Sequence, residues 1–110
     1  MIGLAAKKGS IISGSSACER ELKNASAPYM LKKGKRGLLI LSGDSAMNTK
    51  DKFLRLSYSK GIDYLIFGSG NELGRRVGRG ERSVMIVTDE GLARAIRDLF
   101  GHAAEENGGV

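Results

Sequence analysis

The chain has 110 residues, of which 41% are apolar and only 5% aromatic, so one compact domain with an aliphatic core is expected. Cys18 is the only cysteine, which excludes a disulfide framework and a multi-cysteine zinc site and fits a reducing cytoplasm. The net charge of +6 favours a polyanionic partner, and because no apolar run approaches the roughly 20 residues of a membrane helix, no membrane partner is expected.

The N-terminal third of the sequence predicts two helices. Residues 2–8 are expected to form the first helix. The second carries an S-x-x-E capping box that begins at Ser16, so Ser16 is the expected N-cap. This helix is expected to end or kink near Ala25, because a helix through Pro28 would lose a hydrogen bond and clash with its preceding turn, at a cost of about 3 kcal/mol.

Three short apolar runs further along the chain predict strands that are buried on both faces. They are LLIL at residues 38–41, DYLIFG at residues 63–68 and SVMIV at residues 83–87. Helical segments separate the runs, and this alternation predicts an α/β fold, a three-layer α/β/α sandwich with helices on both faces of the sheet.

Capping signals mark the starts of the remaining helices. Asp44 or Ser45 is expected to cap a helix that reaches about Lys60. Ser69 begins a second capping box, and Asp89 is expected to cap the last helix. The apolar stripe of that last helix comprises Leu92, Ile96, Leu99 and Phe100.

No repeat or linker divides the sequence. Residues 1–101 are therefore expected to form a single domain. The remaining residues, 102–110, read HAAEENGGV and are polar and glycine-rich, which is typical of a flexible tail.

The glycine-rich stretch at residues 68–84, GSGNELGRRVGRGERSV, allows a nucleotide-binding interpretation. A strand, a G-x-G turn and a helix follow one another as in a dinucleotide site. However, Gly68, Gly70 and Gly74 are spaced one residue off that pattern. Glu72 also lies in the first turn, where a pyrophosphate needs positive potential. Turn formation explains these glycines better.

The same stretch carries a cluster of arginines. Arg75, Arg76, Arg79 and Arg82 fall within eight residues, and glycines flank Arg79 on both sides. A guanidinium group offers a planar fork of donors that suits phosphates and guanine edges. The cluster therefore indicates either an RNA-contacting loop or a solvated, charged surface.

Cys18 lies near the start of a predicted helix, where a thiolate would be favoured. The only histidine, His102, lies far away in the sequence, so a nucleophilic pair is not indicated. A small buried side chain is the better interpretation of Cys18, and no spacing of acidic residues suggests a metal site.

Four segments in order resemble the bacterial branch of the ribosomal protein L-seven-Ae family, the kink-turn-binding group. They are IGLAAKKGSIISG near the N-terminus, DSAMNTK from Asp44, NELGRRVG from Asn71 and IVTDEGLARAI from Ile86. The resemblance covers residues 2–99. It implies the L-thirty-e-like fold with a small mixed sheet and a non-enzymatic RNA-binding protein of ribosomal type. The implied target is a kink-turn, a sharply bent RNA element with tandem sheared G·A pairs, and no cofactor or metal is implied.

The resemblance also implies two RNA-binding surfaces. At the start of the second helix the family has a glycine, a polar residue, asparagine, glutamate and, three residues on, lysine; here Ser16 replaces the asparagine, Ala17 the glutamate and Arg20 the lysine. Since these changes remove base-reading groups, reduced or altered kink-turn specificity is expected. The implied RNA-binding residues are Gly14, Ser15, Ser16, Ala17, Arg20 and Lys23 on the first surface and Arg79, Gly80, Glu81 and Arg82 on the second.

The expected partner is structured RNA in the cytoplasm, with ribosomal RNA and ribosome-associated proteins as candidates. A protein-interaction module on the same fold stays open as an alternative, because Ser16 and Ala17 lack the family's base contacts. A nucleotide-binding enzyme resting on residues 68–74 is the other alternative. Between the helix that carries Arg20 and the strand at Leu38, the chain has about nine residues more than the family members considered; the extra piece lies around residues 25–33, and its role is open.

Overall fold

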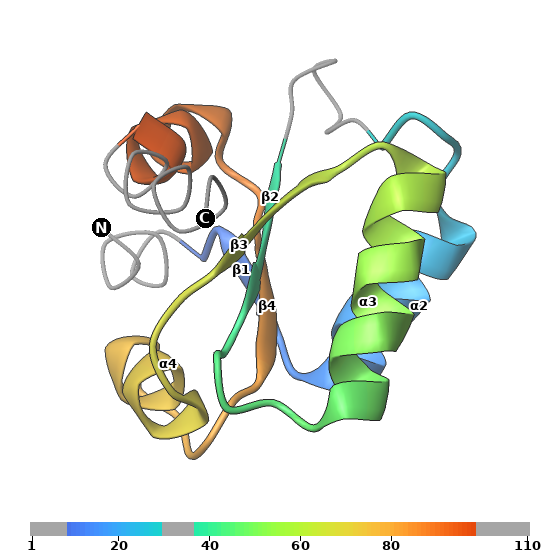
Figure 1. Ribbon diagram of the computed structural model, residues 1–110. Helices are drawn as coiled ribbons and strands as arrows, with labels where there is room; N and C mark the ends of the chain where they lie inside the picture. The colour runs from blue at the N-terminus through green and yellow to red at the C-terminus, as the bar shows by residue number, and fades with distance from the viewer. Residues whose placement is uncertain (1–8, 30–36, 99–110) are drawn as a thin grey trace.

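Four strands form one mixed sheet in the computed structural model, which describes residues 9–29 and 37–98 (Figure 1). The strands are β1 (Ile11–Ser13), β2 (Leu38–Leu41), β3 (Asp63–Ile66) and β4 (Val84–Val87), in the order β1-β4-β2-β3. β2 and β3 are parallel, whereas β4 runs antiparallel to both β1 and β2. The mixed sheet implied by the family resemblance is confirmed.

Helices cover both faces of this sheet. α2 (Ser15–Asn24) and α3 (Met47–Lys60) lie side by side on one face, and α4 (Gly70–Arg76) and the helical residues 90–98 lie on the other (Figure 1). The predicted three-layer α/β/α sandwich is therefore confirmed.

The two central strands divide the core into two halves. Alternate residues of a strand point to opposite faces, so Leu38 and Ile40 pack toward α4 and residues 90–98, whereas Leu39 and Leu41 pack toward α2 and α3. β4 is divided in the same way, and all of its residues are buried. The continuous apolar runs in β2 and β4 arise because both strands are covered on both faces.

β3 departs from the prediction of a buried strand. It ends at Ile66, and only Leu65 among its four residues is buried. Tyr64 and Ile66 are 52% and 45% exposed. The reason is its position, since β3 lies at the edge of the sheet and, within the described residues, has only β2 as a neighbouring strand.

Two predicted helix caps are wrong. α2 has Gly14 as its N-cap, with φ of 96° and no side-chain hydrogen bond, so Ser16 already lies inside the helix. Glycine adopts this backbone conformation without a steric cost, which lets the chain turn sharply out of β1. The N-cap of α3 is Ala46, also without a side-chain bond, so neither Asp44 nor Ser45 caps it.

Other predicted boundaries are confirmed. The Ser69 hydroxyl accepts a hydrogen bond of 3.1 Å from the Glu72 N–H at the start of α4. The Asp89 carboxylate accepts one of 2.9 Å from the Leu92 N–H at the start of the helix at residues 90–98. α2 ends at Asn24, ahead of Pro28, as the proline predicted.

The remaining features of the chain either were not predicted from the sequence or lie outside the described residues. β1 was not predicted at all, because a strand of three residues leaves no readable pattern. The helix expected at residues 2–8, the stripe residues Leu99 and Phe100, the tail at 102–110 and residues 30–33 of the long segment lie outside the described residues. Of the helices in the described ranges, none is long and apolar enough to cross a membrane.

Candidate nucleic-acid interface

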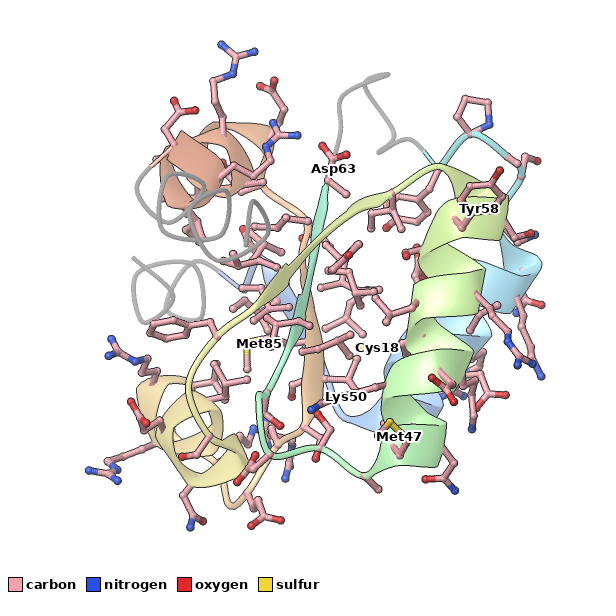
Figure 2. The ribbon with its side chains drawn as sticks, in the orientation of Figure 1. Cys18, Met47, Lys50, Tyr58, Asp63 and Met85 are labelled. Carbon is pink, nitrogen blue, oxygen red and sulfur yellow. The ribbon has the colours of Figure 1, made fainter. Side chains whose placement is uncertain are left out.

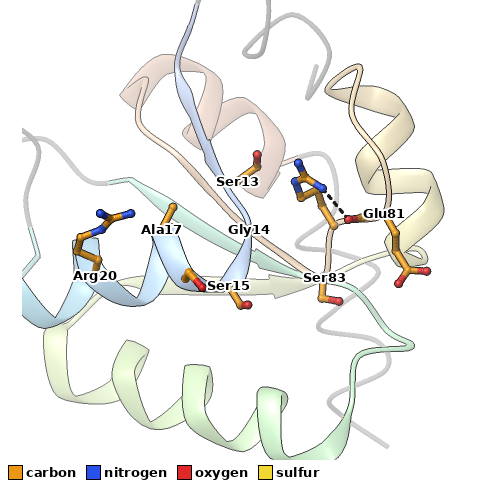
Figure 3. Close-up of a pocket in the computed structure, with 9 residues that line it drawn as sticks. Ser13, Gly14, Ser15, Ala17, Arg20, Glu81 and Ser83 are labelled. Carbon is orange, nitrogen blue, oxygen red and sulfur yellow. Dashed lines mark hydrogen bonds between the residues drawn. The ribbon is translucent and has the colours of Figure 1, made fainter.

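Two segments far apart in the sequence meet at one end of β1 and β4. The Gly14 N–H donates a hydrogen bond of 2.9 Å to the Val84 carbonyl, which sets the start of α2 beside residues 81–83. An open cleft of about 450 Å³ lies between them (Figure 3). Its lining residues are Ser13, Gly14, Ser15, Ser16, Ala17, Arg20, Glu81, Arg82 and Ser83.

The start of α2 gives this cleft a positive potential. The first N–H groups of a helix have no partner within the helix, and here the N-cap Gly14 supplies no side chain to satisfy them. The first turn of α2 also carries no acidic residue. A helix start of this kind favours anions through its exposed N–H groups and its dipole.

Two arginines add charge to the cleft. Arg20 is exposed one turn into α2, across the cleft from Glu81 and Ser83 (Figure 3). Arg82 is half-buried, and its Nη1 donates a hydrogen bond of 2.9 Å to the Glu81 carbonyl oxygen. Glu81 contributes the one carboxylate of the lining, so two guanidinium groups outnumber it.

Glycines of α4 hold the arginine-bearing loop in place. The Arg79 N–H donates to the Gly74 carbonyl at 2.8 Å, and the Arg82 N–H donates to the Gly70 carbonyl at 3.0 Å. A Cβ atom on Gly74 would overlap the Gly80 carbonyl oxygen. These glycines therefore allow close packing of α4 against the loop, which accounts for them without a bound nucleotide.

The structure brings together most, but not all, of the predicted RNA-binding residues. Every one of those predicted on α2 lines the cleft except Lys23, which lies in a second groove between α2 and α3. From the loop, Glu81 and Arg82 line the cleft, whereas Arg79 and Gly80 are exposed outside it. Ser13 and Ser83 were missed, because only the pairing of β1 with β4 places them there.

Comparison with known proteins identifies the family. No protein-family model matches the chain. Over 101 residues, however, it is 31% identical to the RNA-binding protein YlxQ of Bacillus subtilis (strain 168), and the match covers 91% of each chain. The chain belongs to the YlxQ family.

Solved structures similar to this YlxQ-family chain share its fold. A protein with unknown function from Bacillus halodurans superimposes with a TM-score of 0.73 at 32% identity, over 91% of this chain and 92% of the other. The Giardia lamblia 15.5kD RNA binding protein gives a TM-score of 0.66 at 21% identity, over 92% and 79%. YlxQ is named as an RNA-binding protein and not as an enzyme, in agreement with the non-enzymatic protein expected from the sequence.

Lys23 of the YlxQ-family protein belongs to a charged network beside the cleft. Glu19 accepts hydrogen bonds from the ammonium groups of Lys23 at 2.7 Å and Lys52 at 3.1 Å. These two bonds, the one from Lys23 foremost, hold the pKa of the Glu19 carboxyl below its usual range. The network links α2 to α3 and offsets part of the charge of both lysines.

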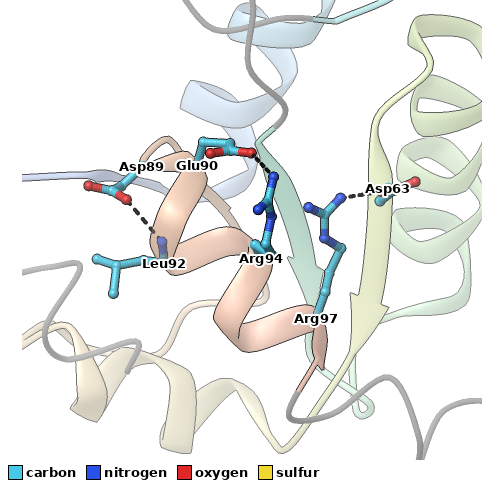
Figure 4. A network of polar contacts seen from close by, with 6 residues as sticks. All are labelled: Asp63, Asp89, Glu90, Leu92, Arg94 and Arg97. Atoms are coloured by element: carbon cyan, nitrogen blue, oxygen red, sulfur yellow. Dashed lines mark hydrogen bonds and ion pairs between the residues drawn. The ribbon is translucent and has the colours of Figure 1, made fainter.

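Other arginines of this YlxQ-family chain have structural partners away from the cleft. The Arg76 guanidinium lies 5.4 Å from the centre of the Phe67 ring, a cation–π contact. Arg97 forms an ion pair of 2.6 Å with Asp63 on β3, and Arg94 forms one of 2.8 Å with Glu90 (Figure 4). The Arg97–Asp63 ion pair ties the helix at residues 90–98 to the sheet, whereas the Arg94–Glu90 pair lies within that helix.

Cys18 of the YlxQ-family chain is a core residue and not a nucleophile. It is fully buried on the α2 side of the sheet, with Met85 on the opposite side (Figure 2), and its Sγ donates to the Ile12 carbonyl at 3.4 Å. Burial, reinforced by the Glu21 charge, raises the pKa of the thiol to about 12. Over residues 9–29 and 37–98, no three His, Cys, Asp or Glu side chains gather as a metal site would require.

Proposed function

We propose that this YlxQ-family protein binds structured RNA in the cleft between the start of α2 and residues 81–83, and that it prefers RNA with a sharp bend, such as a kink-turn. The observation that carries the proposal is the meeting of these two segments. The resemblance to the L-seven-Ae family implies that both segments bind RNA. Both line one cleft although they lie far apart in the amino-acid sequence. YlxQ, named as an RNA-binding protein, matches along 91% of the chain.

The lining of the cleft suits an RNA backbone. Phosphate oxygens accept hydrogen bonds from the free N–H groups at the start of α2 and from the guanidinium groups of Arg20 and Arg82. The hydroxyls of the serines in the lining donate to, or accept from, sugar and base edges. A net charge of +6 adds long-range attraction to the RNA.

Selectivity for bent RNA is proposed because the two sides of the cleft come from separate segments, the start of α2 and residues 81–83. The deep groove of A-form RNA hides base edges from side chains, so proteins recognise structured RNA mostly by its shape. A bend presents two backbone segments to α2 and to residues 81–83 at once, whereas a straight duplex reaches only one. Ser16 and Ala17 offer one short hydroxyl between them for base reading, so specificity below that of relatives with asparagine and glutamate is proposed.

The test compares a kink-turn RNA with a plain duplex of equal length at about 50 and 200 mM salt. Clear preference for the kink-turn at both salt concentrations supports the proposal. Arg20→Ala and Arg82→Ala should weaken binding and lower the salt slope by about one each. Arg55→Ala is the matched control, because Arg55 is an exposed arginine on α3 outside the cleft.

Equal losses in all three arginine variants would contradict a localised site, because they would mean that only the overall charge attracts RNA. Equal binding of both RNAs that collapses at the higher salt would favour the alternative of a protein-interaction module. That alternative draws its support from Ala17, which lines the cleft without a polar side-chain group.

The proposed source of the RNA is ribosomal, and the proposed compartment is the cytoplasm, where a free buried thiol such as that of Cys18 persists in reduced form. Co-sedimentation with ribosomal particles, lost in Arg20→Ala but kept in Arg55→Ala, is the outcome expected of a ribosome-associated protein.

A further inference from the structure

The exposed large apolar side chains of the described residues gather on two neighbouring elements. On α3 they are Met47 and Tyr58, and on β3 they are Tyr64 and Ile66. Met47, Leu54 and Tyr58 recur at seven and four residues, so they share one flank of α3. α3 packs beside β3. A patch of this kind next to a strand edge indicates an interaction surface.

Among the described residues, the backbone of β3 pairs with β2 on one side and with no strand on the other. The Phe67 N–H donates to the Leu41 carbonyl at 2.9 Å, toward β2. Because successive residues of a strand alternate in direction, Leu65 also bonds toward β2, and the N–H and C=O groups of Tyr64 and Ile66 point to the free edge. A free edge of this kind accepts an added strand.

We propose that the added strand is β3 of a second copy of this chain, paired antiparallel about a two-fold axis at Leu65, so that the two four-stranded sheets become one. In this register Tyr64 lies opposite the partner's Ile66, and Ile66 opposite the partner's Tyr64. If the axis passed between two residues, side chains on different faces of the sheet would lie opposite each other. If the axis passed through Tyr64 or through Ile66, the other of these two residues would lie opposite a residue outside β3. The edge is therefore complementary to itself.

The side chains on the α3 face match in the same register. An aromatic residue opposite a β-branched one is a favourable cross-strand pair, and the two-fold axis creates it twice. Tyr58 lies near the end of the molecule where β3 begins at Asp63, and Met47 lies at the other end of α3 (Figure 2). The axis therefore sets Tyr58 toward the partner's Met47, which buries all four exposed apolar residues in one isologous interface.

Charges on the opposite face are also complementary. The same register sets Asp63 opposite the partner's Phe67, whose ring carries the Arg76 guanidinium at 5.4 Å. Asp63 already holds Arg97 at 2.6 Å. Each Asp63 thus lies near a cation of the other subunit, which offsets part of the repulsion between two chains of charge +6. The cleft lies at β1 and β4, so both clefts stay open in the dimer.

The test measures the mass of the full chain without RNA, by sedimentation or light scattering over about a hundredfold range of concentration. The mass should rise from 11.7 kDa toward twice that value. Ile66→Lys should weaken association by about tenfold or more, because the dimer would bury two unpaired ammonium groups. Ser59→Lys is the control, since Ser59 is exposed on α3 outside the patch. A constant 11.7 kDa, or a dimer unaffected by Ile66→Lys, would overturn the proposal.

The register has its own test. Oxidation of a mixture of Tyr64→Cys and Ile66→Cys proteins should give a disulfide-linked dimer, whereas each variant alone should stay uncrosslinked, because equal residues lie about 8 Å apart across the axis. Cys18 is buried and adds no accessible thiol. Crosslinking of either variant with itself, or none in the mixture, would overturn the register at Leu65. Neither result depends on RNA binding.

Discussion

The carboxylate of Asp44, in the loop between β2 and α3, accepts a hydrogen bond of 2.9 Å from the backbone N–H of Gly70, the first residue of α4. The Gly70 carbonyl in turn accepts from the Arg82 N–H at 3.0 Å. A residue predicted to cap its own helix thus supports a different one, 26 residues away, and through it the loop that forms one side of the cleft.

Asp44→Ala should destabilise the protein at neutral pH and much less in acid. The bond from the Gly70 N–H, aided by Ser42, holds the pKa of Asp44 below its usual range. A carboxyl with a depressed folded-state pKa stabilises the fold above its unfolded pKa of about 3.9 and loses this effect as pH falls through the folded value. Urea unfolding of both proteins at several pH values measures the difference. A difference that is the same at neutral pH and well below pH 4 would contradict this assignment.

Gly74→Ala should lower the free energy of unfolding by about 1–3 kcal/mol, as overpacking in a tight site does. The added Cβ would overlap the Gly80 carbonyl oxygen. Gly80→Ala is the control, because a Cβ there meets no atom within 4 Å. Urea unfolding measures both variants, and RNA affinity should fall in Gly74→Ala as the loop shifts. Similar free energies of unfolding for the two variants would show that the loop moves to accommodate the added Cβ without a cost in stability.

Two serines at helix starts should differ in their effect on stability. Ser69→Ala should cost about 1 kcal/mol, because its hydroxyl accepts from the Glu72 N–H at the start of α4. Ser16→Ala should change stability little, since α2 has no side-chain cap. Thermal unfolding separates them. If Ser16→Ala weakens RNA binding at unchanged stability, Ser16 contacts the RNA. An equal loss of stability in both variants would mean that Ser16 caps α2 after all.

Cys18 should resist alkylation in the folded protein. Its thiol is fully buried, and with a pKa of about 12 only about one part in 10⁴ is thiolate at pH 8. Reaction with iodoacetamide should be slow in buffer and fast in concentrated urea. Labelling of the native protein at the rate of a free thiol would mean that the α2 side of the core opens readily.

Sequence patterns predicted the central fold because β2 and β4 are covered on both faces, and such strands are continuous apolar runs. β3 has a similar composition, but a run of apolar residues does not distinguish an edge strand from a central one. β1 is stabilised by its pairing with β4 and not by its own three residues. The position of each strand in the folded sheet therefore explains both the exposed residues of β3 and the unpredicted strand β1.

The candidate site was predictable to the extent that motifs mark it. The resemblance named both segments of the cleft, but Ser13 and Ser83 enter only through the register of β1 and β4. Local capping rules assigned Asp44 to the nearest helix, because they consider only neighbouring residues and not a backbone N–H that folding brings from α4.

The pairing of Ile11 with Val87 has a consequence for the order of assembly. Contacts between residues so distant in sequence carry a high entropic cost of loop closure and form late in folding. A growing chain that has not yet released β4 from the ribosome carries only half of the cleft. The proposed RNA-binding cleft is therefore complete only once β4 has paired with β1, near the end of the described chain.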